Sequence, residues 1–333
     1  MTEADTAAVP AGIQHRRTEF HRQIADKFVQ ELKAFQATGH VNLWQAPWVS
    51  SASPHNGISG HKYSGVNAFT LRLTADIRGI RDPRWYSFLQ ISDQEHYHPK
   101  AKWKLRSGSH GTAVQWYHGW DVVDQRVLST RADIDAAKLS GHDIHWVPWY
   151  TTVFSAEDIE GVPPYEPHGC SDASPDATVS AMADAIHVPV KYDQFDAAYY
   201  TPTFDQIHVP KLEFFRDSNT ASATILHELC HSTGHSSRLN RPGVMSRNED
   251  HAYAKEELTA ELAACLVSSD IAPDGLPADQ FSNSASYLSS WISDISTDPN
   301  VLMTAFNDAD DAANYLLRSI KKGDQPNDTS NLS

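Results

Sequence analysis

The sequence predicts an α+β protein in two parts: a curved antiparallel sheet with one amphipathic helix, followed by a mainly helical domain with a small sheet. The chain of 333 residues is 40% hydrophobic, which suffices for two cores. Eight of the nine Trp precede residue 151. Residues 1–150 hold 17 basic and 14 acidic residues (net +3), whereas residues 151–333 hold 10 and 28 (net −18), which accounts for the total of −15. This asymmetry indicates two domains of different character.

The first predicted element in chain order is an amphipathic helix. Apolar residues recur at helical spacing over about 15–37, and Gly39 is expected to end the helix. Short alternating runs rich in Trp, Tyr, Val and Phe over 40–150 then predict antiparallel strands. The four prolines of 161–177 indicate a linker or a long surface loop.

The second part shows helical patterns, including one at 252–270, and one short strand pattern at 205–210. We expect both chain ends to be disordered because they are polar and lack periodicity. The predicted organisation is a disordered tail (1–14), a first domain (15–150), a linker (151–178), a second domain (179–320) and a disordered tail (321–333).

Composition narrows the class of protein. No run of about 18 apolar residues occurs, and the N-terminus is acidic where a secretory signal would be basic. We therefore expect a cytoplasmic protein with no membrane partner. The three cysteines, Cys170, Cys230 and Cys265, have no CxxC spacing, which argues against a disulfide scaffold or a cysteine-ligated zinc site and favours core thiols.

The run "HELCH" at 227–231 fits the HExxH pattern of zinc metallopeptidases. Residues four apart on a helix are neighbours, so His227 and His231 can bind one Zn²⁺ through their imidazole nitrogens. Glu228 is then placed to act as the general base on a metal-bound water. The alternative is a chance match to the pattern. Chance matches of this kind are rarer when, as here, the histidines also lie on the polar side of an amphipathic helix.

The third ligand decides the class of metallopeptidase. Ser237 occupies the position of the third metzincin histidine, so that pattern fails, and His235 could be a ligand only if the chain turned back sharply. On the helix at 252–270, Glu257 and Glu261 border the apolar stripe, whereas Glu256 is expected to point away. We therefore predict a gluzincin-like site with Glu257 as the third ligand and Glu261 orienting a ligand imidazole. The alternative for these glutamates is an exposed helical charge run.

A basic stripe in the first part suggests a nucleic-acid partner. The run "KAKWKLR" predicts a strand with Lys100, Lys102, Lys104 and Arg106 on one face. Cations beside aromatic runs, at 44–48 and 82–90, are typical of single-stranded DNA binding. The alternatives are a solvated edge strand or DNA contacts on the basic face of the N-terminal helix, formed by Arg17, Arg22, Lys27 and Lys33.

Seven segments, taken in order, resemble ArdC-type antirestriction proteins. They are "HKYSGVNAFTL", "DPRWYSFLQ", "LRSGSHGTAVQWY", "TVFSAEDIEGVP", "AYYTPTFDQIHVP", "TILHELCHSTGHSSRLNR" and "YAKEELTAELAA". The resemblance implies an N-terminal single-stranded-DNA-binding domain, also found in plasmid conjugative primases, and a C-terminal zincin-like metallopeptidase domain that together protect incoming plasmid DNA from restriction. It places Tyr63, Gly65, Asn67, Trp85 and Gln90 in the DNA-domain motifs, and His227, Glu228, His231 and Glu257 in the metal motif.

One departure from the family concerns DNA binding. Relatives have a basic turn where this chain has "RSGSHGT", which predicts weaker or pH-dependent DNA affinity. Two other functions compete with the leading one. The chain could be a zinc protease that cleaves a host restriction component or another specific protein, or a DNA-protecting protein with a catalytically silent zinc site.

Overall fold

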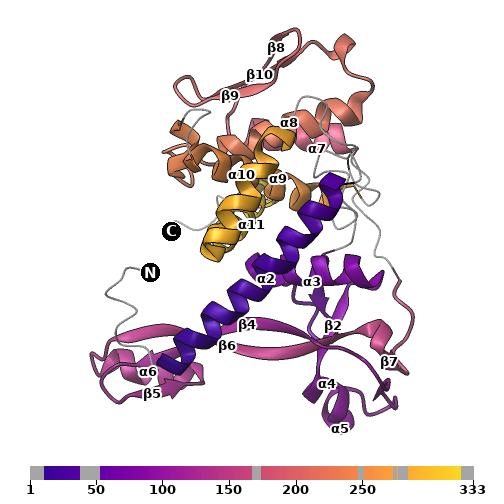
Figure 1. Cartoon of the computed structure of the whole chain (residues 1–333), viewed down its shortest axis with the longest axis vertical. Helices are drawn as coiled ribbons and strands as arrows, with labels where there is room; N and C mark the ends of the chain where they lie inside the picture. The colour runs from indigo at the N-terminus through magenta and orange to yellow at the C-terminus, as the bar shows by residue number, and fades with distance from the viewer. Residues whose placement is uncertain are drawn as a thin grey trace, which may run out of the picture. The chain divides into compact units, whose positions relative to one another are not determined.

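Two compact units make up the chain. The computed structural model describes residues 11–37, 53–166, 174–246, 251–272, 276 and 284–323. The first unit comprises 1–26, 56–61 and 84–163, and the second comprises 27–55, 62–83 and 164–333. Figure 1 labels most of the helices and strands of both units.

The first unit is built on a five-stranded sheet in the order β1-β2-β6-β4-β5. Its strands are β1 (His55–Asn56), β2 (Arg84–Ser87), β4 (Thr112–Asp121), β5 (Arg126–Leu128) and β6 (Ile144–Ser155). The strands β4 and β6 pair antiparallel from Thr112, opposite Val153, to Asp121, opposite Ile144. Both are rich in β-branched and aromatic residues, which suit a pleated surface. Figure 1 shows the two strands curving side by side.

Two helices accompany this sheet. The first part of helix α2 (Ala11–Ala37) packs on it, with the Phe20 ring 4.8 Å from the Tyr150 ring. Helix α6 (Arg131–Leu139) follows β5 and begins with a capping box, in which Thr130 and Asp133 each accept the other's backbone N–H. The ring contact joins α2 to β6, and the capping box fixes where α6 begins.

Short elements complete the first unit: α4 (Phe88–Ser92), α5 (Gln94–Tyr97), β3 (Lys104–Leu105), η3 (Ala156–Asp158) and β7 (Ile159–Glu160). The predicted strand at 100–106 is wrong in extent, because β3 pairs with a β7 of only two residues. The predicted alternation holds: Trp103 is buried, while the basic side chains on either side of it are exposed.

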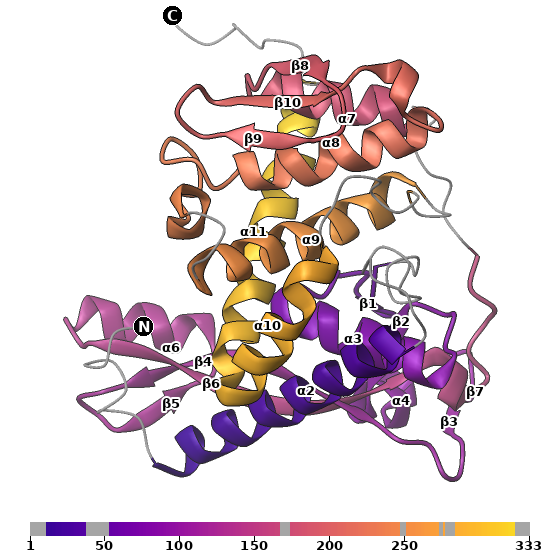
Figure 2. The same ribbon diagram turned by 45° about the horizontal axis from the view of Figure 1, so that its top comes forward.

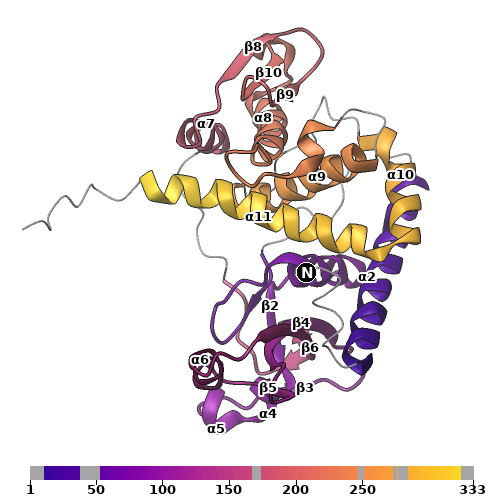
Figure 3. The ribbon, with the colours of Figure 1, turned by 90° about the vertical axis from the view of Figure 1, so that its left-hand side faces the viewer.

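The second unit is mainly helical. Its elements are α3 (Gly65–Arg78), α7 (Pro175–Ala185), β8 (Val190–Gln194), β9 (Tyr199–Thr201), β10 (Gln206–Pro210), η4 (Leu212–Phe214), α8 (Ser218–Ser232), η5 (Pro242–Met245), α9 (His251–Ile271), α10 (Ser284–Thr297) and α11 (Pro299–Gly323). The small sheet has the order β8-β10-β9, with β8 parallel and β9 antiparallel to β10. Figure 2 shows this sheet against α8, and Figure 3 shows α11 alongside α9.

The predicted fold class is confirmed by this architecture. The predicted helix at 15–37 corresponds to α2, the strand at 205–210 to β10, and the helix at 252–270 to α9. Residues 11–14 and 321–323, predicted as parts of the two tails, are helical. Gly39 and the aromatic run at 44–48 lie outside the described residues.

Two further predictions concern the cysteines and membrane-spanning segments. Cys230 and Cys265 are buried free thiols, as expected for core cysteines, whereas Cys170 lies outside the described residues. Each helix in the described ranges is too short or too polar to cross a bilayer.

A partly buried pair of Asp121 and His142 lies at the end of β4. Asp121 Oδ1 accepts from the N–H groups of Val123 and Asp124 (both 3.0 Å), and Oδ2 accepts from His142 Nδ1 (2.9 Å). The hydrogen bond from His142 is the main reason that the pKa of Asp121 is lowered, and the same bond raises the pKa of His142.

We predict that this pair stabilises the first unit most between about pH 4 and pH 6.5, the ordinary pKa values of the two groups. Stability is lost at lower pH, as Asp121 is protonated through its lowered pKa, and at higher pH, as His142 deprotonates through its raised pKa. In thermal unfolding, D121N should therefore cost more stability at pH 6 than at pH 8.5. The exposed pair of Asp143 with His145 (3.1 Å) supplies the control, D143N, which should change little. Equal losses for D121N at both pH values would contradict the prediction.

Candidate metal centre

Helix α8 carries the HExxH run and is buried along most of its length. Asp217 caps its start, because its carboxylate accepts from the Thr220 N–H at 2.8 Å. The helix ends at Ser232, and the Gly234 N–H bonds back to the carbonyl oxygen of His231 at 2.9 Å. The helix therefore ends just before Gly234.

Helices α8 and α9 bring three candidate ligands together. The Nε2 atoms of His227 and His231 are 3.2 Å apart. From α9, Glu257 places Oε2 3.7 Å from His227 Nε2 and Oε1 3.5 Å from His231 Nε2. All three side chains are buried, and one ligand atom of each lies within 4.8 Å of the other two. These are the three residues predicted as ligands from the sequence, and their binding of a metal stays a prediction.

The arrangement fits a divalent metal ion. Atoms bound at about 2.0–2.1 Å to a tetrahedral ion lie about 3.3 Å apart, close to the 3.2–3.7 Å observed here. The buried negative charge also favours a bound cation, because four glutamates are buried here: Glu228, Glu256, Glu257 and Glu261. Arg241 is paired with Glu256. A cation among the other carboxylates would offset the cost of burying them.

The ionisation of these groups reflects the same crowding of charge. Burial lowers the pKa of His227, but hydrogen bonding to Glu257 and the charge of Glu261 outweigh it and raise the pKa to about 9. Desolvation raises the pKa of Glu257, yet the imidazoles of His231 and His227 hold it well below its ordinary range. A metal ion bound here would take the place of the protons that these pKa shifts favour on the imidazoles.

Two further glutamates flank the ligands. Glu228 follows His227 on α8, is 6% exposed, and adds to the negative charge that raises the pKa of both histidines. Glu261 is fully buried, and its Oε2 lies 3.9 Å from His227 Nδ1, beyond hydrogen-bond distance. The general-base role of Glu228 and the orienting role of Glu261 stay predictions.

The structure corrects one inference: Glu256 does not point away from the site. It is 3% exposed, and its Oε1 accepts from His231 Nδ1 at 3.2 Å. Because an ionised carboxylate only accepts, Nδ1 carries the proton and Nε2 is left for a metal ion. Helical periodicity shows only where Glu256 lies relative to the apolar stripe of α9. It does not show that residues of α8 and of the following loop pack against Glu256.

Arg241, in the loop after α8, holds Glu256 in place. Its Nε and Nη2 donate to the two carboxylate oxygens of Glu256 at 2.9 and 2.6 Å. The same guanidinium donates to Thr233 Oγ1 (2.7 Å) and to the Cys230 carbonyl oxygen (2.8 Å). A bidentate clamp of this kind fixes both the position and the rotation of the carboxylate.

Two glycines make room for the loop that carries Arg241. A Cβ at Gly234 would clash with Val244 and lie 3.0 Å from the Arg241 guanidinium. A Cβ at Gly243 would lie 2.7 Å from the Cβ of Glu256. The sequence inference missed Arg241, although the two glycines around it were a signal that backbone and side chains approach closely there.

His235, the alternative ligand, is not brought to the site. Its Nδ1 lies 2.8 Å from Ser237 Oγ and accepts from the Ser237 N–H at 3.2 Å. Its side chain is not part of the converging ligand group found among the described residues.

The residues predicted to bind DNA fall in both units. Tyr63 and Asn67 belong to the second unit and are half-buried. The helix that carries Asn67, α3, packs on α11 through Phe69, whose ring stacks on Phe306 at 4.2 Å. This segment therefore has a packing role in the second unit, and its contact with DNA stays a prediction.

Trp85 and Gln90, in the first unit, have structural partners. Trp85 is 1% exposed, which does not fit stacking on a DNA base. The Gln90 amide closes the cap of α4 with Ser87 and exchanges hydrogen bonds with the Asn56 amide at 2.9 and 3.1 Å. Both residues therefore organise the unit, and neither presents a free surface for stacking.

The basic stripe is exposed throughout. Lys100, Lys102, Lys104 and Arg106 all lie at the surface, and Arg106 comes within 3.8 Å of the Glu160 carboxylate. This geometry suits phosphate contacts and equally suits a solvated edge strand.

The chain is similar to known antirestriction proteins and to a family of zincin-like metallopeptidases. Residues 18–142 match the family model of the N-terminal domain of the anti-restriction factor ArdC, and residues 177–308 match that of a zincin-like metallopeptidase. Crystal structures of the antirestriction protein ArdC from plasmid R388 are similar over 91% of this chain and 98% of theirs when metal-free (TM-score 0.68, 26% identity). The Mn(II)-bound form is similar over 90% of this chain and 97% of its own, with a TM-score of 0.66 and 27% identity. The predicted resemblance to ArdC-type antirestriction proteins is confirmed.

Two larger proteins are also similar. Two Escherichia coli DNA primases named TraC are each 30% identical to the chain, over 321 and 317 residues, which is 91% of this chain in both cases. The chain spans 27% and 20% of their lengths. The ArdC-like part is therefore a module that also occurs within longer proteins.

We predict that R241M lowers the affinity for a divalent metal ion about 10- to 100-fold, because Glu256 would lose the clamp that fixes His231. The measurement is competition with a chelator of known affinity. Arg238, in the same loop, supplies the control R238M, because it donates to the Ser232 carbonyl oxygen (2.7 Å) instead of contacting Glu256. Equal affinity of R241M and wild type, with R241M folded by circular dichroism, would contradict the proposed role of the clamp.

Proposed function

We propose that the chain is a single-stranded-DNA-binding antirestriction protein with a zinc metallopeptidase centre, and that it protects incoming mobile-element DNA from host restriction. The observation that carries the enzymatic half is the convergence of His227, His231 and Glu257 with Glu228 beside them. The resemblance to ArdC over both parts of the chain supports the proposed DNA binding and antirestriction role.

The chemistry of the centre follows from its residues. A divalent metal ion bound here would polarise a peptide carbonyl and acidify a water molecule. Glu228 would accept the proton of the attacking water and donate it to the leaving amine nitrogen. Glu256 would keep His231 in the tautomer that presents Nε2.

Zinc is the metal that this donor set favours. Two imidazoles, one carboxylate and an open fourth position form the ligand set of several catalytic zinc sites. The solved ArdC relative was crystallised with Mn(II), but manganese suits carboxylate and water ligands better than imidazole. We therefore expect zinc to bind more tightly than manganese.

The proposed partners are single-stranded DNA and a protein substrate. The DNA partner is supported by the match to the N-terminal domain of ArdC and by the similarity to DNA primases. The protein substrate would be a host restriction component or another host protein, and the protein would act in the cytoplasm, where restriction takes place. Tyr63, Asn67 and the stripe from Lys100 to Arg106 stay candidates for DNA contacts.

We predict that E228Q lowers peptide cleavage about 100-fold or more, because the general base is lost, while metal content and DNA affinity stay unchanged. The measurement compares cleavage of a peptide library by wild type and E228Q, each loaded with zinc. The exposed Glu213 supplies the matched control, E213Q, which should cleave like wild type.

A plasmid-transfer assay against a restricting host separates the competing functions. Loss of protection in E228Q, with DNA binding retained, would favour a protease acting on a host protein. Full protection by E228Q would instead favour a DNA-protecting protein with a silent site. Equal cleavage by E228Q and wild type would contradict the catalytic role of Glu228.

A further inference from the structure

A row of aromatic rings is exposed on the paired strands β4 and β6 of the first unit. Trp116, His118 and Trp120 alternate along β4, so they share a face of the sheet. Trp149 lies directly opposite Trp116 in the register of β6. Three of these rings form a continuous series, with centroids 4.4 Å apart for Trp116 and His118 and 5.7 Å apart for His118 and Trp149.

The two tryptophans are too exposed for a role in packing alone. Trp116 is 49% exposed and Trp149 is 38% exposed. Leaving so much aromatic surface in water forfeits the stabilisation that burial would give. An exposed cluster of large aromatic rings therefore indicates a binding surface. Trp85, which the resemblance placed in the DNA motifs, is by contrast buried.

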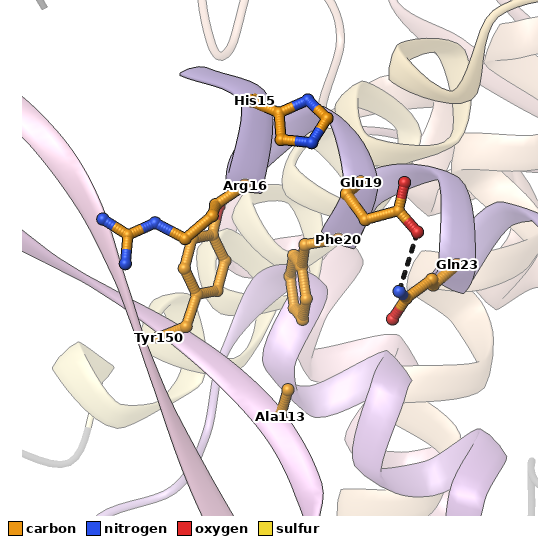
Figure 4. A pocket seen from close by; sticks show the side chains of 7 residues that line it. All are labelled: His15, Arg16, Glu19, Phe20, Gln23, Ala113 and Tyr150. Atoms are coloured by element: carbon orange, nitrogen blue, oxygen red, sulfur yellow. Dashed lines mark hydrogen bonds between the residues drawn. The ribbon is translucent and has the colours of Figure 1, made fainter. Parts of the chain in front are cut away.

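Positive charge lies at one end of the row. The Arg16 guanidinium, on α2, lies 5.7 Å from the centroid of the Trp149 ring. Figure 4 shows Arg16 extending from α2 across Tyr150. The Arg16 guanidinium and the Trp149 ring are thus neighbours, whereas Tyr150, the next residue of β6, points to the opposite face of the sheet.

A hollow beside Arg16 lies on the other face of the sheet, to which Ala113 and Tyr150 point. It measures about 270 Å³ and is lined by His15, Arg16, Glu19, Phe20, Gln23, Ala113 and Tyr150 (Figure 4). The Tyr150 hydroxyl has no hydrogen-bond partner within the described residues, and burial raises its pKa to about 12, so it stays a donor. The Glu19 carboxylate is engaged by the Gln23 amide at 2.9 Å.

The geometry points to a single-stranded nucleic acid whose bases stack on Trp116 and Trp149 and whose phosphates meet Arg16. Bases stack on aromatic faces regardless of sequence, and adjacent cations follow the backbone, which is the usual composition of such surfaces. Duplex DNA keeps its bases stacked on one another and offers no free faces to these rings. This inference rests on the proposed function and assigns its DNA contacts to a surface distinct from the stripe at 100–106.

The test measures binding of the full chain to a fluorescein-labelled 20-nucleotide oligo(dT). W116A and W149A should each raise Kd about 5- to 150-fold, whereas W116F and W149F, which keep an aromatic face, should bind much closer to wild type. R16Q should raise Kd and flatten the slope of log K against log salt by about 0.7. The control is F204A, because Phe204 is an exposed aromatic residue in the second unit. It should bind like wild type.

Two outcomes separate the failure of this inference from that of the proposed function. If wild type binds oligo(dT) and the alanine variants bind equally well, the stacking surface is wrong and the proposed function stands. A slope that falls by up to about 2.8 when the four stripe residues are replaced by alanine would then assign the DNA to the stripe. If wild type does not bind oligo(dT) at low salt, the DNA half of the proposed function fails as well.

Photocrosslinking of wild type keeps the inference testable if the alanine variants misfold. An oligonucleotide containing 5-bromodeoxyuridine should crosslink to peptides that carry Trp116 or Trp149. Crosslinks confined to other peptides would overturn the assignment.

Discussion

The hydrogen bond from His231 to Glu256, clamped by Arg241, is the interaction on which the candidate metal centre depends. Helix periodicity brings His227 and His231 to one side of α8, but periodicity alone fixes neither ring rotation nor tautomer. The neighbours Glu256 and Glu257 divide these tasks, since Glu256 accepts from His231 Nδ1 and Glu257 faces both Nε2 atoms. The centre thus requires α8, α9 and the loop between them to fold together.

The two compact units interleave along the sequence, and this matters for the DNA-binding prediction. Residues 62–83, within the match to the ArdC N-terminal domain, belong to the second unit, where α3 packs on α11. A fragment cut near residue 150 would therefore lose the partners of α3. The predicted boundary at 150 stays a prediction about function, and the full chain is the appropriate material for testing it.

Local sequence patterns predicted the parts of the site that depend on one element. The HExxH helix, the helix at 252–270 and the inward position of Glu257 follow from periodicity, and the structure brings those residues together. Arg241 could not be found in this way, because its contact with Glu256 requires the loop after α8 to fold back. Similarly, alternation predicted the exposed side of the stripe, but the length of β3 depends on its partner β7.

X-ray absorption at the zinc edge of the zinc-loaded full chain tests the central claim most directly. The account predicts one zinc per chain, with two imidazole nitrogens and a carboxylate oxygen at about 2.0–2.2 Å. The imidazole scattering should fall by half in H231A, while H235A should give the wild-type spectrum. A sulfur ligand at about 2.3 Å, or a third imidazole that disappears in H235A, would contradict the assignment of His227, His231 and Glu257.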